Sequence, residues 1–189
     1  SNINATAGYG FYANRTKVYN FNAYQGDRTT VTSTPVYPFD QPENRLLSYY
    51  GRVIYTFNQK YILAGTVRTD GSSRFSEDNR WGVFPSAAFT WRINEENFLQ
   101  SVPALSDLKL RLSYGITGQQ EGIANYSYLP NYATSSNESM YEFGGEFYYM
   151  NAPVAYDENV KWETTETYNA GLDYGFLNGR INGSIDIYK

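Results

Sequence analysis

Four carboxylates that could carry out acid–base chemistry lie close together in the sequence, at Asp157, Glu158, Glu163 and Glu166. Two such groups across a scissile bond are the machinery of a glycosidase, but sequence spacing does not set the separation between them. The sequence contains no His and no Cys, which excludes Ser–His and Cys–His catalysis, disulfides and thiolate metal sites. We favour solvated loop and strand-end charge for the four acids and predict that the chain is not an enzyme.

Oxygen ligands for a cation occur at Asp70–Ser73 and again at Glu77–Asn79. This order lacks the alternating acids and the final Glu of a calcium loop, so a polar turn is the expected structure. The glycine pairs are not followed by Lys-Ser or Lys-Thr, which argues against a phosphate-binding loop. Fifteen Lys plus Arg against nineteen Asp plus Glu give a net charge of -4, and without a basic stripe a nucleic-acid partner is not expected. The sequence therefore predicts no metal and no cofactor.

Aromatic side chains are the strongest candidates for binding, since the sequence has 20 Tyr, 11 Phe and 3 Trp. Many of them lie among Asn, Ser and Glu between residues 118 and 159, where rings can stack on sugars or hold peptide side chains. The candidate ligand-binding residues are Tyr126, Tyr128, Tyr132, Tyr141, Phe143, Tyr148 and Tyr149. The alternative, that these rings pack the loop onto itself or onto a partner protein, stays open.

The elements that must position these residues are strands, because apolar and polar residues alternate over long stretches. The alternation covers residues 46–57, 61–70, 82–93, 108–117, 161–176 and 181–187. Short links at 58–60 and at Asn178-Gly179 predict tight hairpins, and 94–101 predicts one or two helical turns with Asn94 as the N-cap. Residues 1–45 and 118–159 alternate only weakly. No apolar run is long enough for a transmembrane helix.

Charged residues and the aromatic rings of the apolar row occupy alternate positions in the predicted strands, and therefore opposite faces. All of the strand charges oppose the apolar row, at Arg52, Arg68, Arg92, Lys109, Arg111, Asp173 and Asp186. The rings of the apolar row gather near the short links, at Tyr55, Phe57, Tyr61, Trp91, Tyr174 and Phe176. Rings collected at one level are typical of a membrane-interface girdle. This pattern favours a transmembrane barrel over a soluble β-sandwich and places Arg52, Arg68 and Arg111 toward a polar lumen.

Several blocks of the sequence, in order, resemble the SusC/RagA family of TonB-dependent outer-membrane transporters. The blocks are Leu47–Val53, Lys60–Leu63, Arg68–Phe75, Asn79–Gly82, Phe84–Ser86, Trp91–Ile93, Leu108–Arg111, Ser113–Gly115, Thr117–Gln120, Lys161–Thr165 and Tyr168–Asp173. The resemblance covers residues 46–120 and 160–189 and implies an all-β fold, with antiparallel strands forming part of a large transmembrane barrel with long extracellular loops.

The resemblance also implies an organisation. Residues 1–45 would be an extracellular loop or strand-end region, 46–117 barrel strands with a short periplasmic helical link near 94–106, 118–159 a long extracellular loop, and 160–189 a barrel hairpin. We expect the chain to be a fragment, with the plug domain outside it. Such an open piece of sheet needs further strands, because bare edges are not tolerated in lipid.

The function implied by the resemblance is import of a nutrient, such as an oligosaccharide or a peptide, across the bacterial outer membrane. The implied partners are a SusD-like surface lipoprotein, the TonB complex through parts absent from this chain, and outer-membrane lipid. A soluble β-sandwich that serves as a carbohydrate-binding module or surface adhesin remains the alternative. The two differ in whether Val53, Leu63 and Ile185 face outward or pack against a second sheet.

Overall fold

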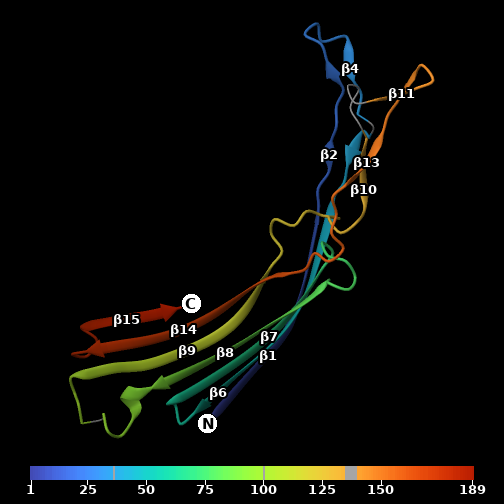
Figure 1. Ribbon diagram of the computed structural model, residues 1–189. Coiled ribbons are helices and arrows are strands. Elements are labelled where there is room, and N and C mark those ends of the chain that lie inside the picture. The colour runs from blue at the N-terminus through green and yellow to red at the C-terminus, as the bar shows by residue number, and fades with distance from the viewer. Residues whose placement is uncertain (36, 100, 135–139) are drawn as a thin grey trace.

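The computed structural model describes residues 1–35, 37–99, 101–134 and 140–189, and its main element is one curved antiparallel sheet (Figure 1). The seven strands lie in the order β1-β6-β7-β8-β9-β14-β15. Their bounds are β1 Asn2–Arg15, β6 Glu43–Phe57, β7 Tyr61–Ser72, β8 Trp81–Arg92, β9 Leu105–Gln119, β14 Glu163–Phe176 and β15 Ile181–Tyr188. Strands β1, β6, β7, β8, β9 and β14 have 12 to 15 residues each, longer than the roughly 9 to 11 that a tilted strand needs to cross a bilayer.

The predicted alternation produces two different faces. Register joins Phe57 to Tyr61, Tyr61 to Trp91, Trp91 to Leu110, Leu110 to Leu172 and Leu172 to Ile185. These residues share the apolar face because side chains alternate strictly along a strand. The predicted charges lie on the other side, which we call the polar face.

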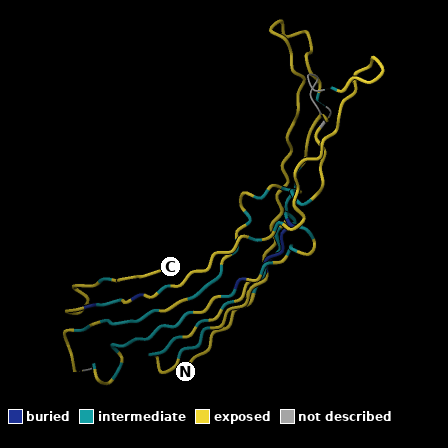
Figure 2. Tube along the Cα trace, viewed as in Figure 1, coloured by how far each residue is buried: buried dark blue, intermediate teal, exposed yellow. Residues whose placement is uncertain are grey.

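The apolar face is not covered by a second sheet, since every other sheet of the described residues has two strands. Val53 and Leu63 are each 51% exposed and Ile185 is 59% exposed, and Figure 2 shows exposed and intermediate residues along all seven strands. The sandwich alternative is therefore wrong. In the described residues only Phe75 and Phe84 are buried hydrophobic side chains, so the sheet has no hydrophobic core of its own.

The ends of the sheet differ, and we name them accordingly. The turn end carries the residues 58–60, the β14–β15 turn and the link after β8. That link begins with a 3-10 helix, η1 Ile93–Glu95, whose N-cap is Arg92. The predicted cap at Asn94 is wrong, because this residue lies inside the helix and its Oδ1 accepts the Leu108 N–H at 3.4 Å.

The β14–β15 turn is longer than the predicted two residues, since Phe176 pairs with Ile181. Leu177 has a positive φ of 53°, as do Asn178 and Gly179 with 58° and 77°. The turn is held from outside, because the Leu177 N–H donates to the Ala104 carbonyl at 2.8 Å and the Gly179 N–H to Ser106 Oγ at 3.0 Å. These contacts with Ala104 and Ser106 hold the turn in a left-handed conformation that is unfavourable for a residue with a Cβ such as Leu177.

Residues 2–15 correct the expectation that all of 1–45 is loop or strand end. They form β1, which pairs with β6 along its whole length, from Asn2↔Thr56 to Arg15↔Glu43. The periodicity was weak because the apolar positions include small Ala5 and Ala7, and because Gly8 and Gly10 stand on the opposite parity. Tyr50 lies directly over Gly8, where an added Cβ would be 2.5 Å from its ring.

The other end, which we call the loop end, carries two protruding arms (Figure 1). Short ribbons build them: β2 Val18–Tyr19 with β5 Phe39–Asp40, β3 Ala23–Tyr24 with β4 Val31–Ser33, β10 Asn131–Thr134 with β13 Asn151–Val154, and β11 Tyr141–Phe143 with β12 Glu146–Tyr148. The first two ribbons continue upward from β1 and β6. The arms are exposed along most of their length (Figure 2).

Candidate functional site

The polar face of the sheet carries ion pairs that hold the predicted arginines in place. Arg68 Nε donates to both carboxylate oxygens of Asp70, at 2.9 and 2.8 Å, and its Nη2 donates to Ser48 Oγ at 3.2 Å. Asp70 is only 6% exposed. A buried carboxylate needs such a paired donor, since burying an unpaired charge is costly.

Arg111 links three strands on the same face. Its Nε and Nη2 donate to Asp173 on β14 at 3.0 and 2.8 Å, and Nη2 also contacts Asp186 on β15 at 3.1 Å. Gly171 lies between them, because it pairs with Arg111 on one side and with Asp186 on the other. Arg52, the third predicted arginine, is exposed and lines a shallow hollow together with Thr66, Ser86 and Thr117.

A cavity of about 620 Å³ opens on the polar face near the loop end. Arg68, Asp70, Phe84, Gln120, Glu121 and Trp162 are among the residues that line it. It therefore offers an ion pair, an amide, a carboxylate and two aromatic rings. This combination suits a sugar or a peptide, which presents both polar groups and apolar faces.

The aromatic wall of this cavity is held by ring–ring contacts. The Trp162 ring lies 5.0 Å from Phe75 and 5.4 Å from Phe84, edge-on to the latter at 70°. Trp162 Nε1 donates to the Arg80 carbonyl at 3.1 Å. Gly118 is required here, since an added Cβ would lie 2.0 Å from the Phe84 ring.

The sequence analysis did not place Phe84, Trp162 or Gln120 in a site. A signal existed for Phe84, because this ring stands on the charged parity of its strand, out of phase with Phe89 and Trp91. Gln120 had no comparable signal. Its role follows from tertiary contacts, in which it accepts from Ser72 Oγ through its side chain and from Arg74 at 3.0 Å through its carbonyl.

The structure divides the predicted aromatic residues into two groups. Tyr126 and Tyr128 lie where the arms meet the sheet, beside Arg15, Glu43 and Arg45. The other five lie farther out. Tyr132 is on β10, Tyr141 and Phe143 are on β11, Tyr148 is on β12 and Tyr149 follows it.

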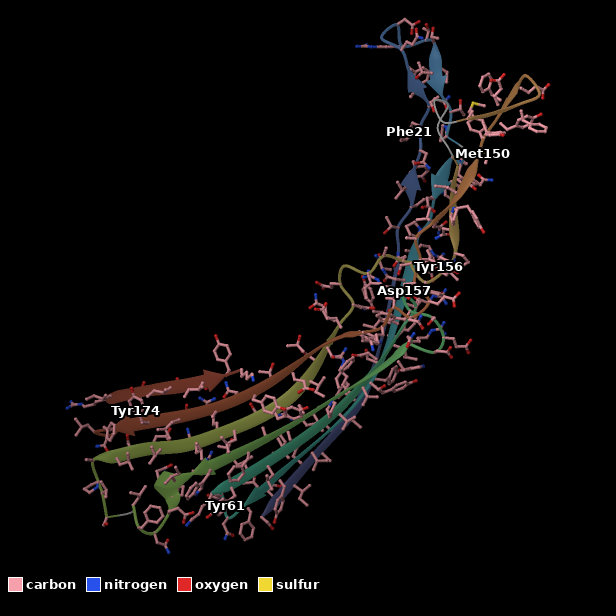
Figure 3. The ribbon with its side chains drawn as sticks, in the orientation of Figure 1. Phe21, Tyr61, Met150, Tyr156, Asp157 and Tyr174 are labelled. Carbon is pink, nitrogen blue, oxygen red and sulfur yellow. The ribbon has the colours of Figure 1, made fainter. Side chains whose placement is uncertain are left out.

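The outer rings are open to ligand. Tyr132 is 69% and Phe143 70% exposed, and Tyr141 pairs with Tyr148 across the β11–β12 ribbon, so these two share one side with Phe143. Figure 3 shows labelled Phe21 and Met150 high on the arms, far from Tyr61 and Tyr174 at the turn end. The arms thus present aromatic rings well away from the sheet.

The four acids do not assemble into a pair on one face of a strand. Glu163 and Glu166 both belong to β14, and an odd spacing places them on opposite faces. Asp157 Oδ1 accepts the Asn159 N–H at 2.8 Å in the turn before the strand, and the Glu158 carbonyl accepts from Ser76 Oγ at 2.9 Å. Figure 3 places Asp157 beside Tyr156 at the base of the arms. Asp157 therefore holds a turn through its carboxylate, whereas the Glu158 contact uses only the backbone.

At the turn end, the Glu96 carboxylate accepts hydrogen bonds from the aromatic row and from a neighbouring lysine. It accepts the Tyr61 hydroxyl at 2.6 Å, the Lys60 ammonium at 2.9 Å and Trp91 Nε1 at 3.1 Å. The Tyr61 hydrogen bond, followed by those of Lys60 and Trp91, lowers the pKa of Glu96 from 4.5 to about 2. Rings whose apolar bodies lie on an oily face and whose tips reach a polar link are suited to a membrane interface.

Over the described residues, no helix has the length and apolarity to cross a membrane. Comparison with known proteins then decides the family. A family model described as TonB dependent receptor-like, beta-barrel, matches residues 1–189. The chain belongs to this family. Its curved sheet is accordingly a section of a TonB-dependent receptor barrel wall, which confirms the predicted fold class.

Individual relatives agree with this membership. The TonB-dependent receptor SusC of Bacteroides thetaiotaomicron is 56% identical over 145 residues, covering 77% of this chain and 14% of that protein. The TonB-dependent receptor P3 of Formosa agariphila is 35% identical over 202 residues, covering 99% of this chain and 19% of that protein. A solved structure titled as the RagAB peptide transporter superposes with a TM-score of 0.78 at 26% identity, over 98% of this chain and 21% of that one. This chain therefore spans between a seventh and about a fifth of these TonB-dependent relatives.

Proposed function

We propose that this chain is part of a SusC-like TonB-dependent transporter that imports an oligosaccharide or a peptide across the bacterial outer membrane. The observation that carries the proposal is the two-faced sheet, with exposed apolar residues on one side and paired charges on the other. A lipid-facing exterior and a polar interior require this arrangement. The SusC and RagAB relatives support the same function.

Within this proposal, each part of the chain has a role. The strands form barrel wall, and Arg52, Arg68 and Arg111 face the lumen. The arms are extracellular loops, and the arm of residues 118–159 carries the ligand-binding rings. The link near 94–106 lies on the periplasmic side. A SusD-like lipoprotein covers the extracellular opening, and the TonB complex supplies energy through parts outside this chain. Within this proposal none of the described residues is assigned a catalytic role.

Uptake by the full-length transporter tests this function. A strain lacking the transporter is complemented with the wild-type protein, and uptake of labelled oligosaccharides and oligopeptides is measured with and without TonB. We expect TonB-dependent uptake of one of the two classes. Growth and uptake that are unaffected by loss of the transporter, for both classes, would contradict the proposal.

The arm rings are tested in the same strain. The variant Tyr141→Ser/Phe143→Ser/Tyr148→Ser removes three rings from a ribbon with little burial, so folding should be retained. Because a stacked ring contributes about 0.5–1.5 kcal/mol, we expect the half-saturation concentration for uptake to rise by roughly tenfold or more. The matched control, Phe21→Ser/Tyr24→Ser/Tyr37→Ser, removes three exposed rings from the other arm. An equal effect of both variants would contradict a specific role for residues 118–159.

A further inference from the structure

A second cavity, of about 570 Å³, lies at the loop end between the outer ends of β1 and β6 and the start of the 118–159 segment. Its charged lining residues are Arg15, Glu43 and Arg45, and Tyr126 and Tyr128 form its aromatic side. None of the transport roles above uses the two arginines.

The cavity is on the apolar side of the sheet rather than on the polar side. Arg45 and Glu43 follow Tyr49 and Leu47 on the same face of β6, since all four occupy alternate positions. Arg15 pairs directly with Glu43 across to β1 and shares that face. A solute in the lumen would contact Arg68 and Arg111 instead. This cavity therefore opens on the outer surface of the barrel wall.

A pair of stacked rings marks the level just below the cavity. Tyr49 and Trp81 lie 6.3 Å apart on the apolar face, with their planes inclined by 22°. Amphipathic rings at the upper edge of an apolar face mark the membrane interface. With a rise of about 3.3 Å per residue and a tilt near 40°, Arg45 lies about 10 Å above Tyr49. Arg45 therefore lies toward the outer side of the headgroup region that these rings mark.

The cavity has an excess of positive charge. Glu43 accepts from Arg15 Nε at 2.8 Å and from Arg15 Nη2 at 2.5 Å, and it also accepts from Arg45 Nε. Two guanidinium groups and one carboxylate leave one net positive charge. Each arginine side chain is 60% exposed whereas Glu43 is 19% exposed. Because a guanidinium has five N–H donors, both arginines retain donors that can reach an outside anion.

The rim of the cavity is fixed at some cost to the backbone. Tyr126 has a φ of 65°, a conformation that is unfavourable for a residue with a Cβ. It is held there while its hydroxyl accepts the Glu43 N–H at 3.2 Å. Strained backbone that the surroundings maintain is typical of binding sites.

We propose that Arg15 and Arg45 bind a phosphate group of the glycolipid in the outer leaflet of the outer membrane. Arginine binds phosphate through two parallel N–H donors, and basic clusters beside a bilayer recognise anionic headgroups. Tyr126 and Tyr128 pack against the attached sugar ring. The site anchors the loop end of the wall to the lipid, in addition to the transport function, and depends on the outer-membrane placement which that function entails.

Lipid binding by the full-length transporter in neutral nanodiscs tests the site, with phosphorylated and dephosphorylated lipid A as probes. We expect Arg15→Gln/Arg45→Gln to weaken binding of the phosphorylated form on the order of tenfold, since each basic residue at the surface contributes to attraction. Glu43→Gln removes the competing carboxylate and should tighten binding severalfold. Misfolding cannot produce that increase. The control Arg28→Gln/Arg180→Gln removes two exposed guanidinium groups outside the cavity and should leave binding unchanged.

Three outcomes would overturn the proposal. These are equal binding of dephosphorylated lipid A, unchanged binding by the Arg15/Arg45 variant, and displacement of the lipid by inorganic phosphate at similar concentration, which would indicate a free-anion site. Nutrient uptake is measured on the same variants. Wild-type protein that imports nutrient but binds both forms of lipid A equally would contradict the lipid site alone, whereas absent uptake in the wild type would contradict the transport function.

Discussion

Arg111 reaches two carboxylates on different strands because the residue between them has no side chain. A Cβ at Gly171 would lie 2.5 Å from Asp186 Oδ1 and 2.8 Å from Arg111 Nη2. Gly51, by contrast, has nothing within 4 Å of its Cβ position. Comparing the same substitution at the two glycines therefore distinguishes a local steric requirement at Gly171 from the general effect of adding a side chain to a strand.

We predict that Gly171→Val destabilises the full-length barrel relative to Gly51→Val. The valine displaces the guanidinium from Asp186, and a partly exposed ion pair of this kind contributes up to about 1 kcal/mol. The measurement is the denaturant concentration at which half of the protein in detergent is unfolded. Unfolding is monitored on gels as the loss of the heat-resistant mobility of the folded barrel. If Asp186→Asn abolishes the difference between the two valine variants, the ion pair is its cause. Equal midpoints for both variants would contradict this role of Gly171.

At the scale of elements, the link after β8 is attached to the sheet through one carboxylate. The depressed pKa of Glu96 means that the folded state favours its charged form. The stability from this group is therefore fully present above its unfolded value of 4.5 and is lost as pH falls toward about 2. The three donors Lys60, Tyr61 and Trp91 lose their charged acceptor within this pH window.

We predict that Glu96→Gln lowers the unfolding midpoint of the full-length protein at neutral pH, and that the difference from wild type shrinks between pH 4.5 and about 2. Fluorescence of Trp91, kept as the only tryptophan of the full-length protein, reports on the same contact. Glu95→Gln is the matched control, because the Glu95 carboxylate accepts a hydrogen bond from the side chain of its sequence neighbour Asn94 at 3.2 Å. A difference independent of pH would show that the charge of Glu96 is not responsible.

Sequence periodicity predicted the elements whose two faces differ strongly, and it failed where the difference is small. Strands β6 to β9 alternate large apolar residues with charges, so their positions follow from pattern alone. The apolar row of strand β1 includes the small Ala5 and Ala7, so its pattern is weak. The position of this strand is set by its register with β6. The Phe84–Trp162 contact joins residues far apart in sequence, which no local pattern records. The exposed arms have too little packing for periodicity to reveal their ribbons.

At the scale of the whole molecule, the apolar face is bounded by aromatic rings at both ends. The sequence analysis identified only the row at the turn end, where Tyr61 and Trp91 stack at 6.3 Å. The structure adds Tyr49 with Trp81 nearer the loop end, whereas Tyr114 and Tyr168, 4.8 Å apart, lie level with Ala87 in the middle of the sheet. Trp81 and Trp91 are ten positions apart on β8, which spans about 25 Å at a rise of 3.3 Å and a tilt near 40°. This matches the height of an outer-membrane apolar band.

Tryptophan depth in the bilayer therefore tests the orientation of the entire sheet. In full-length barrels that keep only Trp81 or only Trp91 of the three tryptophans in this chain, lipids brominated deep in the acyl chain should quench both weakly, because both rings lie at interfaces. Val67→Trp in the same background pairs with Pro85, about midway between the two rows on the apolar face, and should be quenched strongly. Trp162, on the polar side, should be quenched by aqueous iodide but not by brominated lipid. Strong deep quenching of Trp81 would mean that the membrane extends toward Arg45, and would move the lipid phosphate level away from the Arg15–Arg45 cavity.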